Sequence, residues 1–428
     1  MSSKKHLMDG LTMNVQINKG LVPSWCSCVL IALALTTGCT QSNDSTQESE
    51  ANSILEDAST TSTDASIDVV DAEPETTAMP AAPAYLGGDR PATYALPYGY
   101  EPEQEMPLIV SLHGFTGTAA WNDLYWGLSD LTRELGIMVI MPNGRKNLQG
   151  AQFWSATDAC CNFGGASDDD DAYIRGLIEE AQLHFNIDPK RIAVMGHSNG
   201  GFMSYRMACD HADLVTHIGP LAGSSFSEDG RCTPVRPVSV FNIHGTWDMT
   251  IRYEGRSTDI IPASQRPQCE ADACPNETDA CTADEDCQIL DECVQACNPD
   301  DAGKPCRDDC FSAASAGTAE VWTEYFVCSL NAGCYDSSPV YFGPYPSADE
   351  NIAWWAAHNE CSTTQELDMA NFDGAQPGRE TRVTGHADCN EGTNIRLGRI
   401  ERGSHSPALT PAFSTTLIEW ILDTPRSE

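Results

Sequence analysis

The stretch RIAVMGHSNGGFMSYRMAC, residues 191–209, constrains the fold of this chain more than any other. Its first six residues are an apolar run typical of a buried strand, and its last nine are typical of the start of a helix. Between them lies a Gly-x-Ser-x-Gly pattern, in which Ser198 is flanked by Gly196 and Gly200. Small residues at these positions allow a sharp turn and let the helix pass close to the strand. A serine between a strand and a helix in this way presents its hydroxyl to a base.

Strand-like and helix-like patterns alternate along the chain on both sides of this turn. Residues 124–135 and 174–185 repeat apolar side chains at helical spacing, between short apolar runs. The alternation predicts an α/β fold with a mostly parallel central sheet flanked by helices, whose active residues gather at the carboxyl ends of the strands. The predicted strands are 106–114, 136–144, 191–196, 218–223, 237–245 and 394–400.

The serine needs two partners, because its hydroxyl is a weak nucleophile without a histidine base and a carboxylate that orients the base. After a turn of this kind the acid follows the serine along the chain and the histidine comes last. Asp248 follows the predicted strand 237–245, and His405 follows the predicted strand 394–400. Both lie at carboxyl ends, so we expect Ser198, Asp248 and His405 to form a catalytic triad.

Other candidates for the acid and the base fit less well. Asp259 lies in a later segment that interrupts the alternation of strands and helices. His358 lies within the helical pattern IAWWAAHNEC, and His386 precedes the last predicted strand, at its amino end.

The oxyanion that forms during attack on an ester needs backbone N–H donors. We expect one from Asn199, directly after the nucleophile, and one from Phe115, in the loop after SLHG. Gly114 lets the backbone of this loop approach the substrate. We expect His113 to shape the loop rather than act as a base, because it precedes Ser198 in the chain.

The chain has 428 residues, a formal net charge of −38 and 19 cysteines. This length suffices for one large α/β domain. The negative charge disfavours nucleic acid and anionic membrane surfaces, so we expect neither as a partner. The number of cysteines indicates an oxidising compartment.

Residues 1–39 are typical of an export signal, because lysines precede the apolar run VLIALALTTGC, which is too short to span a membrane. The run ends at Cys39, in a sequence that resembles the bacterial lipoprotein cleavage box, whose cysteine is lipidated. Residues 40–83 are rich in Ser, Thr, Asp, Glu, Ala and Pro, which predicts a disordered tether. We therefore expect an exported protein, lipid-anchored at the cell surface or periplasmic face, with ordinary secretion as the alternative.

Residues 256–345 interrupt the alternation and contain ten of the cysteines. Cys293 and Cys297 are four residues apart, as are Cys306 and Cys310, which on a helix places both sulfurs of a pair on one face. We expect a helical insert stapled by disulfides, with a zinc site as the competing interpretation. The insert lies between the acid and the base in sequence, which suggests a lid or a polymer-gripping surface, with a purely stabilising role as the alternative.

Asp168 to Asp171 form a run of four carboxylates before a predicted helix. Capping of the helix and complementation of its dipole are the expected roles, and a calcium site is the alternative. We expect no metal.

Five stretches carry a resemblance to a known family: PLIVSLHGFTG, FWSATDACCNFGGASDDDDAYIRGLI, IDPKRIAVMGHSNGGFMSYRMAC, HGTWDMTIRYEG and IAWWAAHNEC. They resemble the extracellular poly(3-hydroxybutyrate) depolymerase and feruloyl esterase group, which belongs with the first carbohydrate esterase family on the α/β-hydrolase fold. The resemblance covers residues 84–255 and 346–425. It implies a catalytic domain over 84–428 that hydrolyses carboxylic esters without a cofactor, and it places the same three roles on Ser198, Asp248 and His405.

The resemblance also implies two disulfides, Cys209 with Cys232 and Cys361 with Cys389. The sequence leaves open whether the adjacent Cys160 and Cys161 join each other. Family members often follow the histidine with a Trp-Pro pair, whereas this chain has GSHSPALTP, without the tryptophan.

The sequence thus predicts a monomeric, exported serine esterase that acts on polymer-linked esters. Feruloyl or acetyl esters of polysaccharides and polyhydroxyalkanoates all need the same triad, so the sequence does not choose among them. A serine peptidase of the same fold is one alternative, and a surface-binding protein without catalytic activity that uses the insert is the other.

Overall fold

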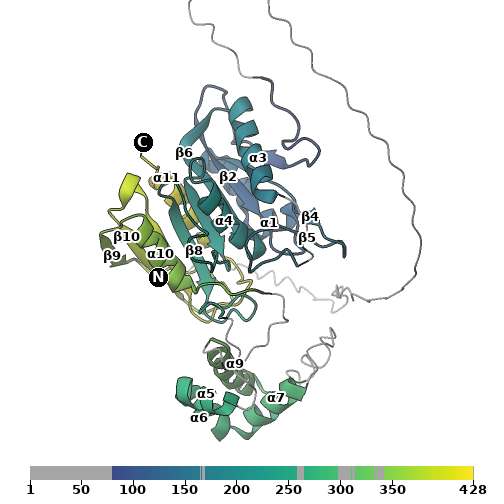
Figure 1. The fold of residues 1–428 in the computed structure, drawn as a ribbon, viewed down its shortest axis with the longest axis vertical. Helices are drawn as coiled ribbons and strands as arrows, with labels where there is room; N and C mark the ends of the chain where they lie inside the picture. Colours follow the sequence, from purple (N-terminus) through teal and green to yellow (C-terminus); the bar gives the residue numbers. More distant parts are fainter. Residues whose placement is uncertain are drawn as a thin grey trace, which may run out of the picture.

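The computed structural model describes residues 80–163, 165, 169–257, 265–296, 310, 314–331, 334 and 342–427. Within these residues, nine strands form one sheet in the order β1-β3-β2-β6-β7-β8-β11-β10-β9 (Figure 1). The six central strands run parallel, whereas β1 at one edge and β10 and β9 at the other pair antiparallel. Their bounds are β1 Thr93–Ala95, β2 Met106–Leu112, β3 Met138–Met141, β6 Ile187–His197, β7 His217–Leu221, β8 Ser239–Gly245, β9 Thr363–Glu366, β10 Thr381–Ala387 and β11 Ile395–Ile400.

Two hydrophobic cores lie on the two faces of this sheet. Alternate side chains of a strand point to opposite faces, so Leu108 and Val110 of β2 join one core and Ile109 joins the other. Helices α3, α4 and α10 cover the first face, and α1, α2 and α11 cover the second. Their bounds are α1 Ala119–Trp126, α2 Leu128–Leu135, α3 Asp170–His184, α4 Asn199–Asp210, α10 Ala348–His358 and α11 Pro411–Asp423.

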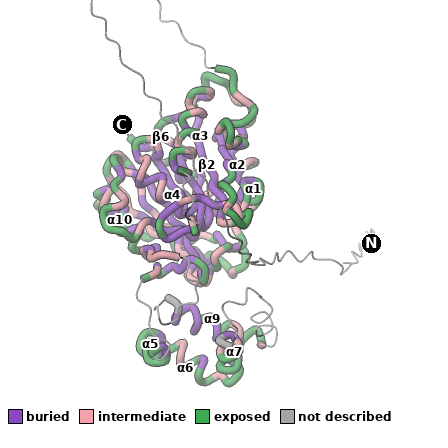
Figure 2. Tube along the Cα trace, turned by 45° about the vertical axis from the view of Figure 1, so that its right-hand side comes forward, coloured by how far each residue is buried: buried purple, intermediate pink, exposed green. Residues whose placement is uncertain are grey.

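This arrangement is the α/β-hydrolase fold, as the sequence predicted. The central strands are buried on both faces, which explains why they are continuous apolar runs in the sequence (Figure 2). A short hairpin of β4 Arg145–Lys146 and β5 Gln152–Phe153 lies outside the main sheet.

Two parts of the fold differ from the sequence-based expectation. The apolar repeat over 124–135 predicted one helix, but Gly127 adopts a left-handed conformation with φ of 62° and separates α1 from α2. Strands β1, β9 and β10, at the two ends of the sheet order, were missed altogether. Strand β9 is TTQE with every residue exposed, so it carries no apolar signal.

The cysteine-rich insert, residues 256–345, is helical where it is described, as predicted. Helices α5 Arg266–Ala273, α6 Pro275–Ala283, α7 Glu285–Ala296 and α9 Ala316–Asn331 lie apart from the sheet (Figure 1). They enclose a core of their own, with Leu290, Trp322 and Phe326 among its buried residues. The two ends of the insert are tied together, because Arg256 N–H donates to Tyr345 O at 2.8 Å and Tyr345 N–H donates to Arg256 O at 3.1 Å.

Disulfides staple this insert internally. They join Cys269 to Cys334, Cys274 to Cys328, Cys281 to Cys287 and Cys293 to Cys310. Since the described cysteines of the insert are paired with each other, they do not provide the thiolates that the zinc interpretation required. Cys297 and Cys306 lie outside the described residues.

Three further disulfides lie in the α/β part of the chain. Two are the pairs that the resemblance implied, Cys209 with Cys232 and Cys361 with Cys389, and the third joins Cys160 to Cys161. The proposed export signal, Cys39 and the tether lie outside the described residues. Among the helices that are described, none has both the length and the apolar character needed to cross a membrane.

Glu270 organises the polar interior of the insert. Its carboxylate accepts hydrogen bonds from Arg266 Nε at 2.6 Å, Tyr325 OH at 2.9 Å and Ser329 Oγ at 2.6 Å. Glu270 is itself 5% exposed, so it links α5 to α9 through groups that water does not reach.

Replacing Glu270 with Ala is expected to destabilise the insert by roughly 3 kcal/mol, because it removes the shared acceptor of buried donors. Hydrogen exchange followed by mass spectrometry should then be faster in α5 and α9, and unchanged in the strands of the sheet. Glu292→Ala, at an exposed position of α7, is the matched control. Equal protection of α9 in the two variants would contradict this role of Glu270.

Candidate active site

Ser198 lies on the sharp turn between β6 and α4. Its backbone has φ of 55° and ψ of −117°, a strained conformation, and its N–H donates to Leu221 O at 2.8 Å. A Cβ on Gly196 would lie 2.3 Å from the backbone of Gly200, and a Cβ on Gly200 would lie 2.2 Å from Leu112 O. Both positions therefore require glycine, and both allow the start of α4 to pass against strands β6 and β2.

The structure brings Ser198, His405 and Asp248 into one hydrogen-bonded series. Ser198 Oγ lies 2.9 Å from His405 Nε2, and His405 Nδ1 lies 2.7 Å from Asp248 Oδ2. Asp248 is on the loop after β8 and His405 on the loop after β11, so each residue follows a parallel strand at its carboxyl end. Ser198 is 8% exposed and Asp248 is 2% exposed, which leaves the serine at the surface end of the series.

The loop around Asp248 holds this carboxylate ionised. Its Oδ1 accepts hydrogen bonds from the N–H groups of Thr250 and Ile251, both at 2.8 Å, and its Oδ2 also lies 3.2 Å from His244 Nε2. Burial by itself would raise the pKa of Asp248. The electrostatic interaction with His405 and the hydrogen bonds from His244 and His405 outweigh that effect and hold the pKa well below its usual range.

His197, the residue before the nucleophile, fixes the position of His405 through its backbone. His197 Nε2 lies 2.8 Å from His405 O, and the two imidazole rings are 5.0 Å apart. Burial lowers the pKa of His197 to about 3, so the ring is neutral and donates its Nε2 proton to that carbonyl.

His197 and His244 were both missed by the sequence analysis. The available signal was their position, since each lies at the carboxyl end of a predicted strand, like the residues of the expected triad. That position does not distinguish a histidine that reacts from one that holds a loop.

The loop after β2 reaches the nucleophile, as expected for a source of oxyanion donors. A Cβ on Gly114 would lie 3.4 Å from Ser198 Cβ, so this loop is in contact with the turn. Phe115 is the next residue of the loop, and its ring packs edge-on against Phe163 at 5.5 Å. Asn199 is the first residue of α4, and the N–H groups of a first helical turn have no partner within the helix. The oxyanion role of Phe115 and Asn199 remains a prediction.

His113 is engaged at both ring nitrogens and is neutral. Nδ1 lies 2.8 Å from Gly114 O, Nε2 accepts the N–H of Gly144 at 2.8 Å, and burial lowers its pKa to about 4. The carbonyl of His113 accepts the indole N–H of Trp154 at 2.9 Å, and the backbone of Trp154 makes two hydrogen bonds with the side chain of Asn199. This network ties the loop after β2 to the start of α4 and supports a structural role for His113.

The other two candidates for the base, His358 and His386, lie away from Ser198. His386 is in the antiparallel strand β10 with Nδ1 3.0 Å from Thr364 Oγ1, and His358 is stacked on Trp354. Neither takes part in the series of Ser198, and Asp259 lies outside the described residues.

The acidic run before α3 pairs with cationic side chains. The N-cap residue, Asp169, makes no side-chain capping bond, so that part of the expectation is wrong. Asp170 accepts from Arg90 at 2.5 Å and Asp171 pairs with Arg206, and both lie in the first turn, where they complement the helix dipole. Asp168 lies outside the described residues. Across the described ranges, no group of three or more His, Cys, Asp or Glu side chains could hold a metal ion.

The neutral histidines give this protein a predictable response to acid. A histidine in the unfolded chain has a pKa near 6.5, whereas burial lowers that of His113 to about 4 and that of His197 to about 3. Between pH 6.5 and 4 the unfolded chain therefore binds protons that the folded protein does not bind. The free energy of unfolding must fall as the pH drops through this window, by at most about 1.4 kcal/mol per pH unit for each histidine.

His113→Asn is expected to reduce this pH dependence, because it removes one of the groups that causes it. Urea unfolding at pH 6.5, 5.5 and 4.5 would measure the slope for wild type and variant. His184→Asn, at the outer end of α3, is the matched control and should keep the wild-type slope. Identical slopes for all three proteins would contradict the assignment of His113 as a buried neutral group.

The family model that matches this chain is Esterase, described as "Putative esterase", over residues 84–366. The chain is 24% identical over 210 residues to feruloyl esterase B of Piromyces equi, covering 46% of this chain and 38% of that protein. It is 29% identical over 123 residues to poly(3-hydroxyalkanoate) depolymerase C of Paucimonas lemoignei, covering 28% of each. Both matches span less than half the length of these curated relatives.

Among solved structures, an acetyl xylan esterase from Aspergillus awamori is similar over 77% of this chain and 93% of its own, with 14% identity and a TM-score of 0.35. The family match covers well over half of the 428 residues and includes both Ser198 and Asp248. The chain therefore belongs to this esterase family.

Proposed function

We propose that this protein hydrolyses carboxylic esters through an acyl-enzyme formed on Ser198. The observation that carries the proposal is the unbroken series of hydrogen bonds from Ser198 through His405 to Asp248. As Ser198 Oγ attacks the ester carbonyl, His405 Nε2 takes its proton and then gives it to the leaving alcohol. Water then attacks the acyl-enzyme with His405 again as the base, and the acid leaves as Ser198 regains its proton. Membership in the esterase family supports an ester as the substrate.

Asp248 orients His405 and stabilises the positive charge that the imidazole gains during attack. Its lowered pKa keeps it ionised in mildly acidic solution, and its second oxygen is held by backbone N–H groups. The carboxylate therefore acts by position and charge and does not take the proton itself.

The backbone N–H groups of Asn199 and Phe115 stabilise the oxyanion of the tetrahedral intermediate. The contact of Gly114 with Ser198 supports this assignment, because it brings the loop after β2 beside the reacting serine. No cofactor enters any of these steps.

We further propose that the esters are linked to polymers and that the protein works outside the cytoplasm. The names of its relatives, a feruloyl esterase and a poly(3-hydroxyalkanoate) depolymerase, support the first part. The lysines and the apolar run of residues 1–39, which resemble a lipoprotein export signal ending at Cys39, and the polar composition of residues 40–83 support the second. The disulfides also favour an oxidising compartment.

Ser198→Ala is expected to lower kcat on p-nitrophenyl acetate by about 10⁴-fold or more, because the nucleophile of the acyl-enzyme is lost. The variant should also lose labelling by a fluorophosphonate probe while its thermal unfolding stays close to that of wild type. Ser362→Ala, at an exposed position, is the matched control and should keep full activity.

A Ser198→Ala variant that kept wild-type turnover would refute the proposal. Wild-type protein that cleaved peptides and not esters would be a peptidase of the same fold. Wild-type protein that bound polymer and ignored the probe would be a surface-binding protein.

The insert contacts the loops that carry the acid and the base, which supports a role in substrate access. Arg402, three residues before His405, pairs with Glu320 of α9 and lies 3.2 Å from Glu324, one turn further along α9. The guanidinium of Arg402 also lies over the ring of Trp247, the residue before Asp248, at 4.4 Å. We propose that the insert limits or guides the approach of bulky substrates to Ser198.

Deletion of residues 262–340 tests this role, and the hydrogen bonds between Arg256 and Tyr345 remain to hold the cut ends together. The activity on a polymeric ester should change more than the activity on p-nitrophenyl acetate, because only a bulky substrate reaches the insert. The double variant Glu320→Gln, Glu324→Gln keeps the insert and removes its charged contact, and it should shift activity in the same direction by a smaller factor. Equal loss on both substrates in a folded deletion variant would rule out the access role.

A further inference from the structure

A second histidine, His244, contacts the carboxylate that orients His405. It lies in β8 and is 1% exposed. Its Nε2 is 2.8 Å from Ile251 O and 3.2 Å from Asp248 Oδ2. Both of these oxygens are acceptors, so Nε2 carries the proton of the ring. A proton on Nδ1 would find no hydrogen-bond acceptor within the described part of the chain. His244 therefore directs one N–H group at the loop and at the carboxylate of Asp248.

The oxygen that His244 approaches is the one that orients the base. Asp248 Oδ2 lies 2.7 Å from His405 Nδ1 and 3.2 Å from His244 Nε2. The other oxygen, Oδ1, accepts the backbone N–H groups of Thr250 and Ile251. Because an N–H group beside a carboxylate stabilises its negative charge, it also reduces the attraction of that charge for a proton on a neighbouring group. The two histidines therefore share one source of negative charge.

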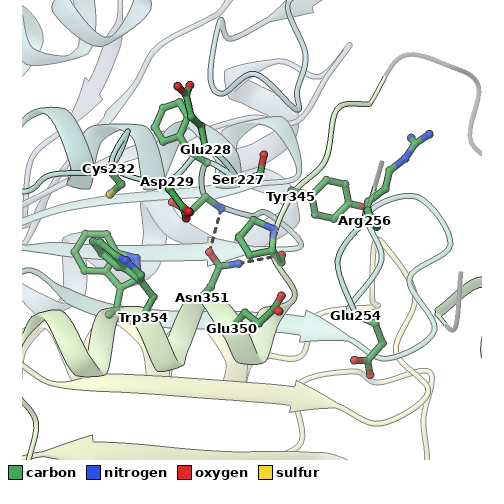
Figure 3. A pocket seen from close by; sticks show the side chains of 16 residues that line it. Ser227, Glu228, Asp229, Cys232, Glu254, Arg256, Tyr345, Glu350, Asn351 and Trp354 are labelled. Atoms are coloured by element: carbon green, nitrogen blue, oxygen red, sulfur yellow. Dashed lines mark hydrogen bonds between the residues drawn. The ribbon is translucent and has the colours of Figure 1, made fainter. Parts of the chain in front are cut away.

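The loop after Asp248 is also held by contacts that do not involve His244. Tyr345 OH accepts the N–H of Arg252 at 2.9 Å. Tyr345 is itself buried, and its ring packs edge-on against Phe202 of α4 with centroids 5.7 Å apart. It also lines a cavity of about 500 Å³ beside α10 (Figure 3). Because Tyr345 fixes this loop against α4, the loop keeps an anchor when the N–H of His244 is removed.

Other titratable side chains surround Asp248 and the two histidines. Those that are neutral between about pH 5 and pH 9 are Tyr125, His197, Tyr253 and Tyr345. Burial lowers the pKa of His197 to about 3 and raises the pKa of each of these tyrosines. The charged side chains on the adjoining strands and loops are Arg252, Asp373, Arg399 and Arg402. Substitution of His244 leaves all of these groups in place, so a change in the pH dependence of the reaction reports on His244.

We propose that His244 is a positioning residue of the reaction, which shares the carboxylate of Asp248 with His405 and thereby sets the pH above which His405 acts as a base. The N–H of His244 stabilises part of the negative charge that would otherwise hold a proton on His405. His405 therefore gives up its proton more readily and stays competent as a base in mildly acidic solution. This inference rests on the proposed esterase function.

The pH dependence of kcat/KM on p-nitrophenyl acetate, measured with the full chain, tests this role. His244→Phe keeps a planar ring and removes the N–H, so Asp248 then stabilises the protonated form of His405 more strongly. The acid-side midpoint of the profile should move to higher pH by about 0.5 to 1 pH unit. His244→Gln, whose amide N–H reaches a position close to that of Nε2, should return the midpoint toward the wild-type value. His184→Gln, at the outer end of α3, is the matched control and should keep the wild-type profile.

Two additions keep the test decisive. The rate of labelling of Ser198 by a fluorophosphonate probe, followed over the same pH range, reports the same midpoint without the deacylation step. If His244→Phe does not fold, His244→Asn takes its place, because its amide is too short to reach Asp248 Oδ2, and the midpoint should again rise.

A role for His244 as a support of the loop alone gives a different result. In that case kcat/KM would fall by the same factor at every pH with its midpoint unchanged, and this outcome would overturn the proposal. A midpoint that stayed in place with full activity, or that moved to lower pH, would overturn it as well. If wild type neither hydrolysed the ester nor reacted with the probe, the esterase proposal itself would fail. If wild type did both and His244→Phe kept the wild-type midpoint, only the role of His244 would fail.

Discussion

The close approach of β2, β6 and α4 is the constraint on which the rest of this site depends. Gly196 and Gly200 are in contact through their backbones, and Gly200 lies against the carbonyl of Leu112, so no side chain fits at either position. This packing leaves Ser198 no extended conformation, and the turn carries a strain of roughly 1–3 kcal/mol. The strand β6 at the centre of the sheet and the buried face of α4 supply the stability that offsets it. Ser198 is therefore held in place by the core and not by its own loop.

Three histidines at the carboxyl ends of strands hold the loops of the site in position. His113 follows β2 and holds the loop after that strand, His197 ends β6 and holds the backbone of His405, and His244 in β8 lies 2.8 Å from Ile251 O, in the loop of Asp248. Each uses a ring nitrogen to reach a carbonyl from a buried position. For His113 and His197 burial removes the positive charge, so they support the loops without adding a cation beside His405. Asp248 therefore provides the negative charge beside the imidazole of His405.

The cysteine-rich insert is a separate unit that follows β8 in the chain, at the carboxyl ends of the parallel strands. Its helices have their own core and internal disulfides, and α5 and α6, with 8 and 9 residues, are too short to be stable in isolation. Its two ends are tied together at Arg256 and Tyr345, which also line the cavity beside α10. Its other contact, through Arg402, reaches the loops of Trp247 and His405. The insert therefore contacts the loop of His405 through Arg402, and its two ends line the cavity beside α10.

The sequence by itself determined the α/β-hydrolase fold and the order of Ser198, Asp248 and His405, because strands buried on both faces leave strong apolar runs and place the next residues at one edge. It also indicated a disulfide-stapled helical insert, since cysteine spacing is a local signal. It could not find the edge strand β9, whose residues are all exposed, nor β10 beside it, nor the break at Gly127. Only the tertiary structure decided which histidines hold loops, how the cysteines of the insert pair, and that Arg256 and Tyr345 tie the ends of the insert together. Those features depend on residues far apart in the chain, and local patterns carry no information about which distant side chains the fold will bring together.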